Sequence, residues 1–574
     1  MQEYYQRQLY NLRVLAKEFA QKHPTAAPML SGESADPDVE RLLEGVAFLT
    51  ALIRKKIDDD FPEIIHNLAA IIFPQFLKSV PATSIVKFFP KTSLSSPLTI
   101  PKGISLSTPP MEEKGRCIFQ TCFETKVYPL EIVQVEKEDI PGNKEKITIT
   151  LKSKMDLKSL SIDYLDFFLH GDFITATEIF LALTTNLEDI VLTYPQDNTK
   201  EYLGNKTLYP LGFDPHNSIL PLSENIFPGF TLIQEYFLLP QKFLFLRLKD
   251  LNNRLKSTEE VKLSFIFKNR NRNLKQVGLD NFVLYATPVI NIFESESEPI
   301  ILEHTKEKIR VLPERQEELD PIIYDIQEVS GYVEGSVEKI DYLPFSIFTP
   351  TQANQIYYQV RHSLSPVSNK PETFLKIFYP EKLKEIKKQT ITCKLLCTNG
   401  SLTEKIHLGD ISEPTSNSPE TVEFKNIIPV TSSVMPLLSK EKLWDFISHI
   451  SLNLLSLANT QGLKKILKFY NFQERTDKAK VLANDKRIDS IKDIQVKAVD
   501  KIVKGIILRG REVLLTLNQE EFASTGDMYL FCSVLKELFS QYTHLNSFIK
   551  LKVTDLSEGI NFTWPTTIGR RTLI

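Results

Sequence analysis

The sequence predicts a multidomain α+β protein, with a helical N-terminal region, β-rich middle domains and an α+β C-terminal domain. At 574 residues the chain is too long for one hydrophobic core, and about three or four domains are expected from usual domain sizes. Its 36 phenylalanines and 33 prolines stand against 2 tryptophans and 6 methionines, a balance that favours strands, turns and rigid connections. Apolar residues recur at helical spacing near both ends and with period two between them.

The first predicted domain, residues 1–80, carries apolar stripes at helical spacing. One stripe runs from Tyr5 to Phe19 before His23-Pro24, and a second from Val39 to Ile53 follows Asp36, a candidate N-cap. A third helix is expected at about 62–73. The stripes fit either a small bundle within the chain, the more usual arrangement, or a seam for helices of another chain. Their members form our candidate partner interface: Tyr5, Leu9, Leu12, Phe19, Val39, Leu42, Val46, Leu49 and Ile53.

Two β-rich domains are predicted next, at 81–310 and 311–435. Residues 147–151 and 261–267 alternate as half-buried strands do. Pro288 lacks an N–H and is expected at an edge or bend and not in a central strand. Cys393 and Cys397 are expected on one strand face, and Asn399-Gly400 predicts a hairpin turn.

The last predicted domain, 436–574, opens with an apolar-striped helix at 439–458. A strand is expected at 510–517 and an amphipathic helix at 527–542. Helices and strands alternate here, which predicts an α+β domain.

A glutamate inside an apolar stretch raises a separate question. Phe243 to Leu246 is apolar on both alternating faces, which predicts a strand buried on two sides. Glu235, between Gln234 and Tyr236, would need partners if buried, because an unpaired charge away from water costs several kcal/mol. Since charged residues are seldom buried, a partly exposed glutamate at a strand end is the expected arrangement.

Charge and motifs exclude several classes of function. The net charge is -3, from 69 basic and 72 acidic residues, so neither nucleic acid nor an anionic membrane is indicated as a partner. The N-terminus lacks the pattern of a secretory signal, and no uncharged run is apolar enough for a membrane span, so a cytoplasmic protein is expected. Five cysteines suit a reducing compartment.

No chemistry-bearing motif is complete. Gly505 and Gly510 have P-loop spacing, but Arg511 and Glu512 stand where Lys and Ser or Thr are required. No zinc knuckle, His-Glu-x-x-His helix or nucleophile elbow is present. We therefore predict no catalytic residues, no cofactor and no metal, and His449 on the 439–458 helix is expected to be structural.

Several separated stretches resemble the TssF family (also called ImpG or VasA) of type VI secretion proteins. They include Tyr4 to Leu9, Asp36 to Gly45, Phe227 to Leu251, Thr287 to Phe293, Thr398 to Gly400, Ser448 to Ser456, Arg509 to Arg511, Asn546 to Phe548 and Trp564 to Arg570. The resemblance spans nearly the whole chain, with Cys532 standing where that family usually has glycine.

The resemblance implies a non-enzymatic, structural wedge subunit of the cytoplasmic baseplate, docked at the inner-membrane complex through partners. It implies assembly with TssG and TssK, contact with TssE and the VgrG hub, two copies of this subunit in each wedge, and support of sheath assembly and contractile effector delivery. Two other hypotheses stay open: a baseplate protein derived from a contractile phage tail, and a β-rich polysaccharide-active enzyme. An enzyme needs a concave cluster of ionisable groups, whereas a scaffold needs apolar contact surface.

Overall fold

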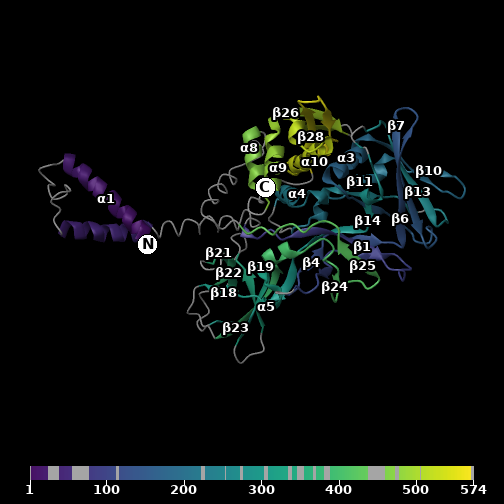
Figure 1. Cartoon of the computed structure of the whole chain (residues 1–574). Helices are drawn as coiled ribbons and strands as arrows, with labels where there is room; N and C mark the ends of the chain where they lie inside the picture. Colours follow the sequence, from purple (N-terminus) through teal and green to yellow (C-terminus); the bar gives the residue numbers. More distant parts are fainter. Residues whose placement is uncertain are drawn as a thin grey trace. The chain divides into compact units, whose positions relative to one another are not determined.

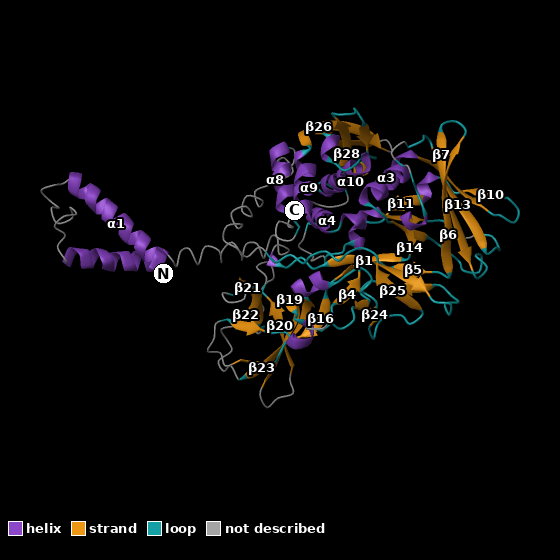
Figure 2. Ribbon diagram, viewed as in Figure 1, coloured by secondary structure: helices purple, strands orange, loops and turns teal. Residues whose placement is uncertain are grey.

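The computed structural model describes residues 2–22, 38–54, 77–111, 115–221, 227–252, 254–271, 274, 276–302, 308–333, 339–345, 355–365, 370–379, 388–436, 459–471, 477–503 and 506–569. The chain falls into two compact units, Met1–Leu77 with Leu437–Ile450, and Lys78–Pro436 with Ser451–Ile574. Helices at the N-terminus and many sheets after it confirm the multidomain α+β prediction (Figures 1 and 2). The division into four domains stays a prediction.

The first unit contains two described helices, α1 (Gln2–Lys22) and residues 38–54. Small side chains lie at their buried positions: Ala20, Ala47 and Ala51. An ion pair of 2.7 Å joins Arg13 on α1 to Glu40 on the second helix. Both helices follow the predicted periodicity, while the helices expected at 62–73 and 439–458 lie outside the described residues.

The second unit is built on a six-stranded sheet that joins distant parts of the chain. Its order is β24 (Glu413–Pro414), β3 (Ser105–Ser107), β4 (Ile118–Thr121), β15 (Ala286–Ile290), β1 (Thr83–Pro90) and β25 (Val422–Asn426). Pro288 lies in β15, so the prediction of an edge position is wrong: β1 and β4 flank this strand. The ladder between β15 and β4 spans only Val289 and Ile290, and Pro288 lies just beyond it, where its carbonyl accepts from the Cys122 N–H at 2.8 Å. A missing N–H is more easily tolerated at the end of a ladder than in its middle.

Two further sheets lie in the segment between β5 (Thr125–Val127) and β15. One has the order β10 (Lys200–Tyr202), β9 (Leu187–Thr193), β13 (Glu260–Phe267), β7 (Lys144–Ser153) and β6 (Leu130–Ile140). The other has the order β11 (Leu208–Pro210), β12 (Phe245–Leu248), β8 (Leu165–Leu169) and β14 (Phe282–Leu284), and β2 (Leu98–Ile100) pairs with β5 (Thr125–Val127). The alternation predicted at 261–267 is confirmed, because Val261, Leu263 and Phe265 are all buried.

Helices stand beside these sheets. They are α3 (Phe173–Leu181), which continues as the π-helix η3 (Ala182–Asn186), and α4 (Pro228–Leu238), which is followed by the 3-10 helix η6 (Pro240–Leu244). Short 3-10 turns also occur at η4 (Asn205–Thr207), η5 (Pro215–Asn217) and η7 (Leu279–Asn281).

An eight-stranded sheet encloses its own apolar core. Its order is β16 (Phe293–Glu296), β23 (Gln389–Thr398), β19 (Ile322–Val333), β20 (Lys339–Pro344), β21 (Tyr357–Leu364), β22 (Pro371–Phe378) and β18 (Ile309–Val311), with β17 (Ile300–Leu302) also on β23. Backbone bonds from Glu298 to Leu312 and from Glu314 to Glu296 link the two outer ends. The short helix α5 (Gln316–Leu319) precedes β19.

Two predictions for this sheet had different outcomes. Cys393 and Cys397 are both buried in its core, as expected for one strand face. The Asn399-Gly400 hairpin is wrong: β23 ends at Thr398 and the chain enters the 3-10 helix η8 (Gly400–Lys405). Gly400 has a φ of +52°, and a Cβ there would lie 2.4 Å from Ile322, so glycine serves a close approach and not a two-residue turn.

The C-terminal segment places three helices against a mixed sheet. The helices are α8 (Thr460–Phe469), α9 (Lys478–Asp489) and α10 (Thr525–Gln541), with the 3-10 turn η10 (Gln519–Glu521). The strands are β26 (Ile491–Val503), β27 (Ile506–Leu517), β28 (Phe548–Asp555), β29 (Asn561–Thr563) and β30 (Thr567–Ile568). The strand predicted at 510–517 and the helix predicted at 527–542 are confirmed.

Candidate functional site

An exposed apolar stripe marks the second helix of the first unit. Leu42, Val46, Leu49 and Ile53 are 70%, 45%, 60% and 61% exposed. Their spacing of four, three and four residues places them on one helix face. The buried Ala47 and Ala51 lie on a different face of this helix. Large aliphatic side chains gathered on one exposed face are typical of a protein interaction surface.

The candidate interface residues divide into two groups. Tyr5, Leu9 and Leu12 on α1, together with Val39, are half-buried in the structure. Phe19 is 50% exposed and belongs with the exposed set. The α1 stripe is thus half-buried while the Leu42 to Ile53 stripe is exposed, and the role of either stripe as a partner interface stays a prediction.

Glu235 is the centre of a buried polar network in the second unit. It lies on α4 and is buried, so the expectation of a partly exposed glutamate at a strand end is wrong. Pro228 occupies the first position of this helix, where no intrahelical N–H is needed and its fixed φ suits the helix start. The strand expected from Phe243 begins at Phe245, after η6, although its burial on both faces is as predicted.

The Glu235 carboxylate has four donors, which offset the cost of its burial. One oxygen accepts from the Ser218 hydroxyl at 2.6 Å and from the backbone N–H groups of Ile219 and Leu220 at 2.6 and 3.0 Å. The other oxygen pairs with the Lys242 ammonium, and both charged side chains are only 1% exposed. A buried ion pair is tolerated when its remaining hydrogen-bonding capacity is also satisfied.

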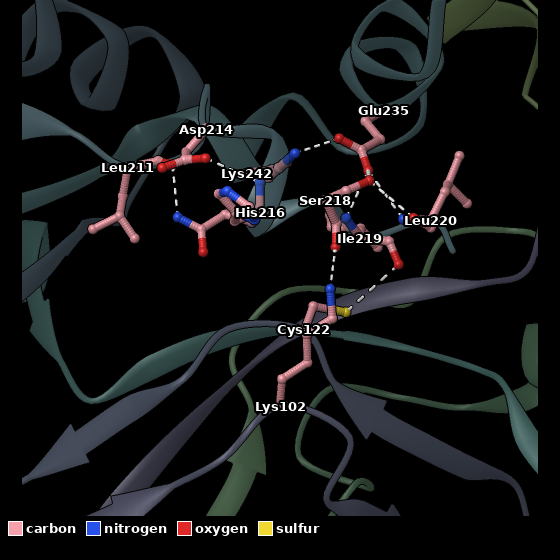
Figure 3. A network of polar contacts seen from close by, with 11 residues as sticks. Lys102, Cys122, Leu211, Asp214, His216, Ser218, Ile219, Leu220, Glu235 and Lys242 are labelled. Atoms are coloured by element: carbon pink, nitrogen blue, oxygen red, sulfur yellow. Dashed lines mark hydrogen bonds and ion pairs between the residues drawn. The ribbon is translucent and has the colours of Figure 1, made fainter. Parts of the chain in front are cut away.

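This network fixes the loop of residues 211–221 between α4 and the six-stranded sheet. Figure 3 shows Glu235 and Lys242 on one side of the loop, and Lys102 and Cys122 on the other. Lys102 donates to the Ser218 carbonyl at 3.0 Å, and the Cys122 thiol lies 4.0 Å from the Ile219 carbonyl. At Gly212 a Cβ would lie 2.3 Å from the Lys242 carbonyl, so only glycine allows this approach.

Lys242 and Ser218 were not identified from the sequence. The available signal was Lys242 itself, the one charged residue between Glu235 and Arg247 in a long apolar stretch. Pro240 ends α4 and the chain turns through η6, which brings Lys242 back to the carboxylate seven positions earlier.

Buried polar contacts also attach α10 to α3 and α9. Glu178 on α3 accepts from the Gly526 N–H at the start of α10 at 2.8 Å. Asp527, fully buried, accepts from Arg487 of α9 at 2.9 Å. Trp564 stacks on Tyr529 and donates to Ser533 at 3.2 Å. These contacts attach the C-terminal segment to the β-rich part of the second unit.

One cavity of the second unit brings several ionisable side chains together. This cavity, of about 460 Å³, is lined by Lys87, Glu131, His170 and Asp280, among others. Both ring nitrogens of His170 face backbone carbonyls, at 3.2 and 3.3 Å. Burial, and then the charge of Lys425, lowers the pKa of Lys87. The described part of the chain contains no cluster of His, Cys, Asp and Glu that could hold a metal ion.

The five cysteines are free and buried. Burial raises the pKa of Cys117, Cys122 and Cys397 to about 12 and that of Cys393 to about 11. The thiolate is the reactive form of cysteine. These thiols therefore stay protonated near neutral pH, and their side chains serve to pack the core.

None of the described helices combines the length and apolar character needed to cross a lipid bilayer. The model of the protein family described as "Type VI secretion system, TssF" matches residues 1–571 of the chain. The chain belongs to the TssF family. The type VI secretion system component TssF1 of Pseudomonas aeruginosa is 28% identical, over 99% of this chain and 98% of that protein.

Two solved structures extend the comparison. A chain in the cryo-electron microscopy structure of the type VI secretion TssK-TssF-TssG baseplate subcomplex superposes with a TM-score of 0.80 and 25% identity, covering 93% of this chain and 99% of that chain. A chain of the baseplate complex from the type VI secretion system shares the fold, with a TM-score of 0.63 and 21% identity over 100% of both chains. The protein is thus a homologue of a TssF baseplate component, and the family resemblance found in its sequence is confirmed.

Proposed function

We propose that the protein is a structural wedge subunit of a type VI secretion baseplate, assembling with TssG and TssK. One observation carries the proposal, the TssF family match over residues 1–571. Likeness over 93% of the chain to a solved TssK-TssF-TssG subcomplex supports it. A match of that length includes both the helical first unit and the β-rich second unit. The family match favours secretion over a phage-tail or polysaccharide-degrading role.

The exposed stripe of Leu42, Val46, Leu49 and Ile53 is the proposed surface for TssG. Four aliphatic side chains at this spacing fit the groove of an amphipathic partner helix. The proposal has four further parts. Two copies of the subunit surround one TssG, and the subunit contacts TssE and the VgrG hub. Its role is non-enzymatic, and the baseplate is cytoplasmic and docked at the inner-membrane complex. The family resemblance supports these finer points.

Co-expression with the TssG and TssK proteins of the same genome tests the proposal. Size-exclusion chromatography with light scattering should give a complex containing all three proteins. The Leu42→Asp/Leu49→Asp variant should lose TssG, because two charges would enter an apolar seam. Both side chains are largely exposed, so the free variant should fold. A charge at Leu9 is a poorer test, because this half-buried residue belongs to the packing of the chain.

The matched control is Asn11→Asp/Gln21→Asp, which adds the same two charges at exposed polar positions of α1. The control should retain TssG. A native chain that folds but associates with neither partner would overturn the wedge function. A Leu42→Asp/Leu49→Asp variant that still binds TssG would leave the wedge function standing and remove this stripe from the interface.

A further inference from the structure

The hairpin of β26 and β27 extends beyond the sheet to which it belongs. The two strands pair with each other from Ile491 and Leu517 to Val503 and Ile506. The next strand, β28, pairs with β27 only from Gly510 to Leu517. The β arm, defined as residues 500–503 and 506–509, is therefore a two-stranded ribbon, and a ribbon of two strands alone is only marginally stable in water. Figure 1 shows this hairpin among the yellow strands at the top.

The β arm carries apolar side chains that the chain does not bury. Ile502 and Ile507 are opposite each other across the two strands and are 72% and 68% exposed. By strand alternation they share a face with Val513, which is buried further down the same strand. Between Val513 and Ile507 this face carries the exposed Arg509 and Arg511, with Asp500 opposite Arg509, so the two isoleucines form a separate apolar pair near the end of the arm.

The outer edge of β26 is open. This strand ends the sheet order, and the described residues provide no backbone hydrogen bond to its outer side. Proteins usually shorten or distort such edges to prevent pairing with other chains. β26 has 13 residues, and its one register shift lies at the start, between Ile491 and Asp493, so most of its length is a regular template for another strand.

The charge around this edge is positive. Lys497, Lys501, Arg509 and Arg511 are exposed on the arm and the strand segments next to it. The acids on these strands are Asp493, Asp500 and Glu512, and Glu512 is already paired with Lys552 at 2.9 Å and Lys550 at 3.7 Å. Lys501 donates to the Thr566 hydroxyl at 3.1 Å and remains exposed. A segment that binds here should therefore be acidic.

We propose that the open edge of β26 binds an extended, acidic segment of another protein chain, which adds a strand to the sheet and covers Ile502 and Ile507. The bound segment should alternate apolar and acidic residues. Its apolar side chains would then lie beside Ile502 and Ile507 on one face, and its acidic side chains beside Lys497 and Lys501 on the other. The free N–H and C=O groups of β26 supply the affinity and the side chains supply the selectivity. This docking site is separate from the helical stripe proposed for TssG and does not depend on it.

Binding of a fluorescent alternating glutamate-valine heptapeptide to the full chain tests the proposal. Saturable binding is expected, with slowed hydrogen exchange at alternate amides of β26, because only every second N–H faces the open edge. The Lys497→Glu/Lys501→Glu variant should bind about tenfold more weakly, since two attractions become repulsions. Ile502→Asp should also weaken binding. The matched control, Lys478→Glu/Leu482→Asp, changes one lysine and one exposed leucine of α9 and should bind as the native chain does.

Three outcomes would overturn the proposal. They are absence of saturable peptide binding to the native chain, equal binding of a lysine-valine peptide, and binding that the β26 variants leave unchanged. Two parallel assays identify another occupant: retention on phosphatidylglycerol vesicles without peptide binding would assign the arm to a membrane surface, and arm-dependent dimerisation would assign it to a second copy of the chain. Each assay uses the isolated chain, so a failed TssG interaction would not affect its result.

Discussion

Replacing Lys242 by methionine tests whether the buried charge network holds the 211–221 loop in place. Methionine keeps most of the side-chain volume and removes the ammonium, so the change isolates the charge. Glu235 then remains buried with its three neutral donors, Ser218, Ile219 and Leu220. Breaking a buried ion pair by removing one partner typically costs about 3–5 kcal/mol. Because these donors still stabilise the carboxylate, we expect about 3 kcal/mol.

The reverse change, Glu235→Gln, should cost more. Glutamine has one oxygen where the carboxylate has two, so it cannot accept both from the loop and from the Lys242 ammonium, which is 1% exposed. About 4–5 kcal/mol is therefore expected. The double variant Glu235→Gln/Lys242→Met buries no charge, and its amide oxygen can still accept from the loop. Its cost should therefore fall well below the sum of the two single changes, to about 2 kcal/mol.

Hydrogen exchange at the Ile219 and Leu220 amides measures these costs locally, without assuming two-state unfolding of a large chain. A loss of 3 kcal/mol should speed their exchange more than about a hundredfold, since about 1.4 kcal/mol corresponds to a factor of ten. The Leu395 amide, in the core of the eight-stranded sheet, serves as the internal control. Single-variant costs that simply add in the double variant, or unchanged exchange at the two loop amides, would refute the reasoning.

Three further predictions concern the second unit. Gly526→Ala should destabilise the chain by about 1–3 kcal/mol, because the new Cβ would lie 2.4 Å from the Thr177 backbone. The control Gly45→Ala places its Cβ where no atom lies within 4 Å, so it should be neutral or stabilising. Equal melting temperatures of the two variants would contradict this prediction. The described thiols should resist Ellman's reagent at pH 8 until denaturant is added, since burial raises the pKa of Cys122 to about 12; rapid labelling of the native chain would show that they are accessible. Burial alone would raise the pKa of Asp555, but hydrogen bonds from Glu558, Ser557 and Gln519 lower it, so its contribution to stability is present above the unfolded-state pKa and is lost as the pH falls toward the folded-state value. Asp555→Asn should therefore reduce stability at neutral pH and flatten its decline in acid, and an unchanged acid limb in a denaturation series would show that this carboxylate is not the group responsible.

The sequence by itself determined the local structure wherever one periodicity dominated. The stripes of Tyr5 to Phe19 and Val39 to Ile53 predicted the two N-terminal helices, and strict alternation predicted β7 and β13. Separated motifs along the chain were sufficient to indicate the family. These features depend on neighbouring residues, which a sequence displays directly.

Only the tertiary structure decided how those elements are used. The two N-terminal helices carry similar apolar stripes, but only the α1 stripe is half-buried. The second helix buries the face of Ala47 and Ala51, which leaves its Leu42 to Ile53 stripe exposed. The strand β15 is central because β1 and β4, from distant parts of the chain, pair with its two sides. The sequence around Pro288 does not show these two strands, so it wrongly predicts an edge position. Glu235 is buried because Lys242 and the Ser218 loop surround it, and the outer edge of β26 is open because no strand of the described residues pairs with it. Burial and pairing are relations between segments far apart in the chain, and no local pattern records which segments meet.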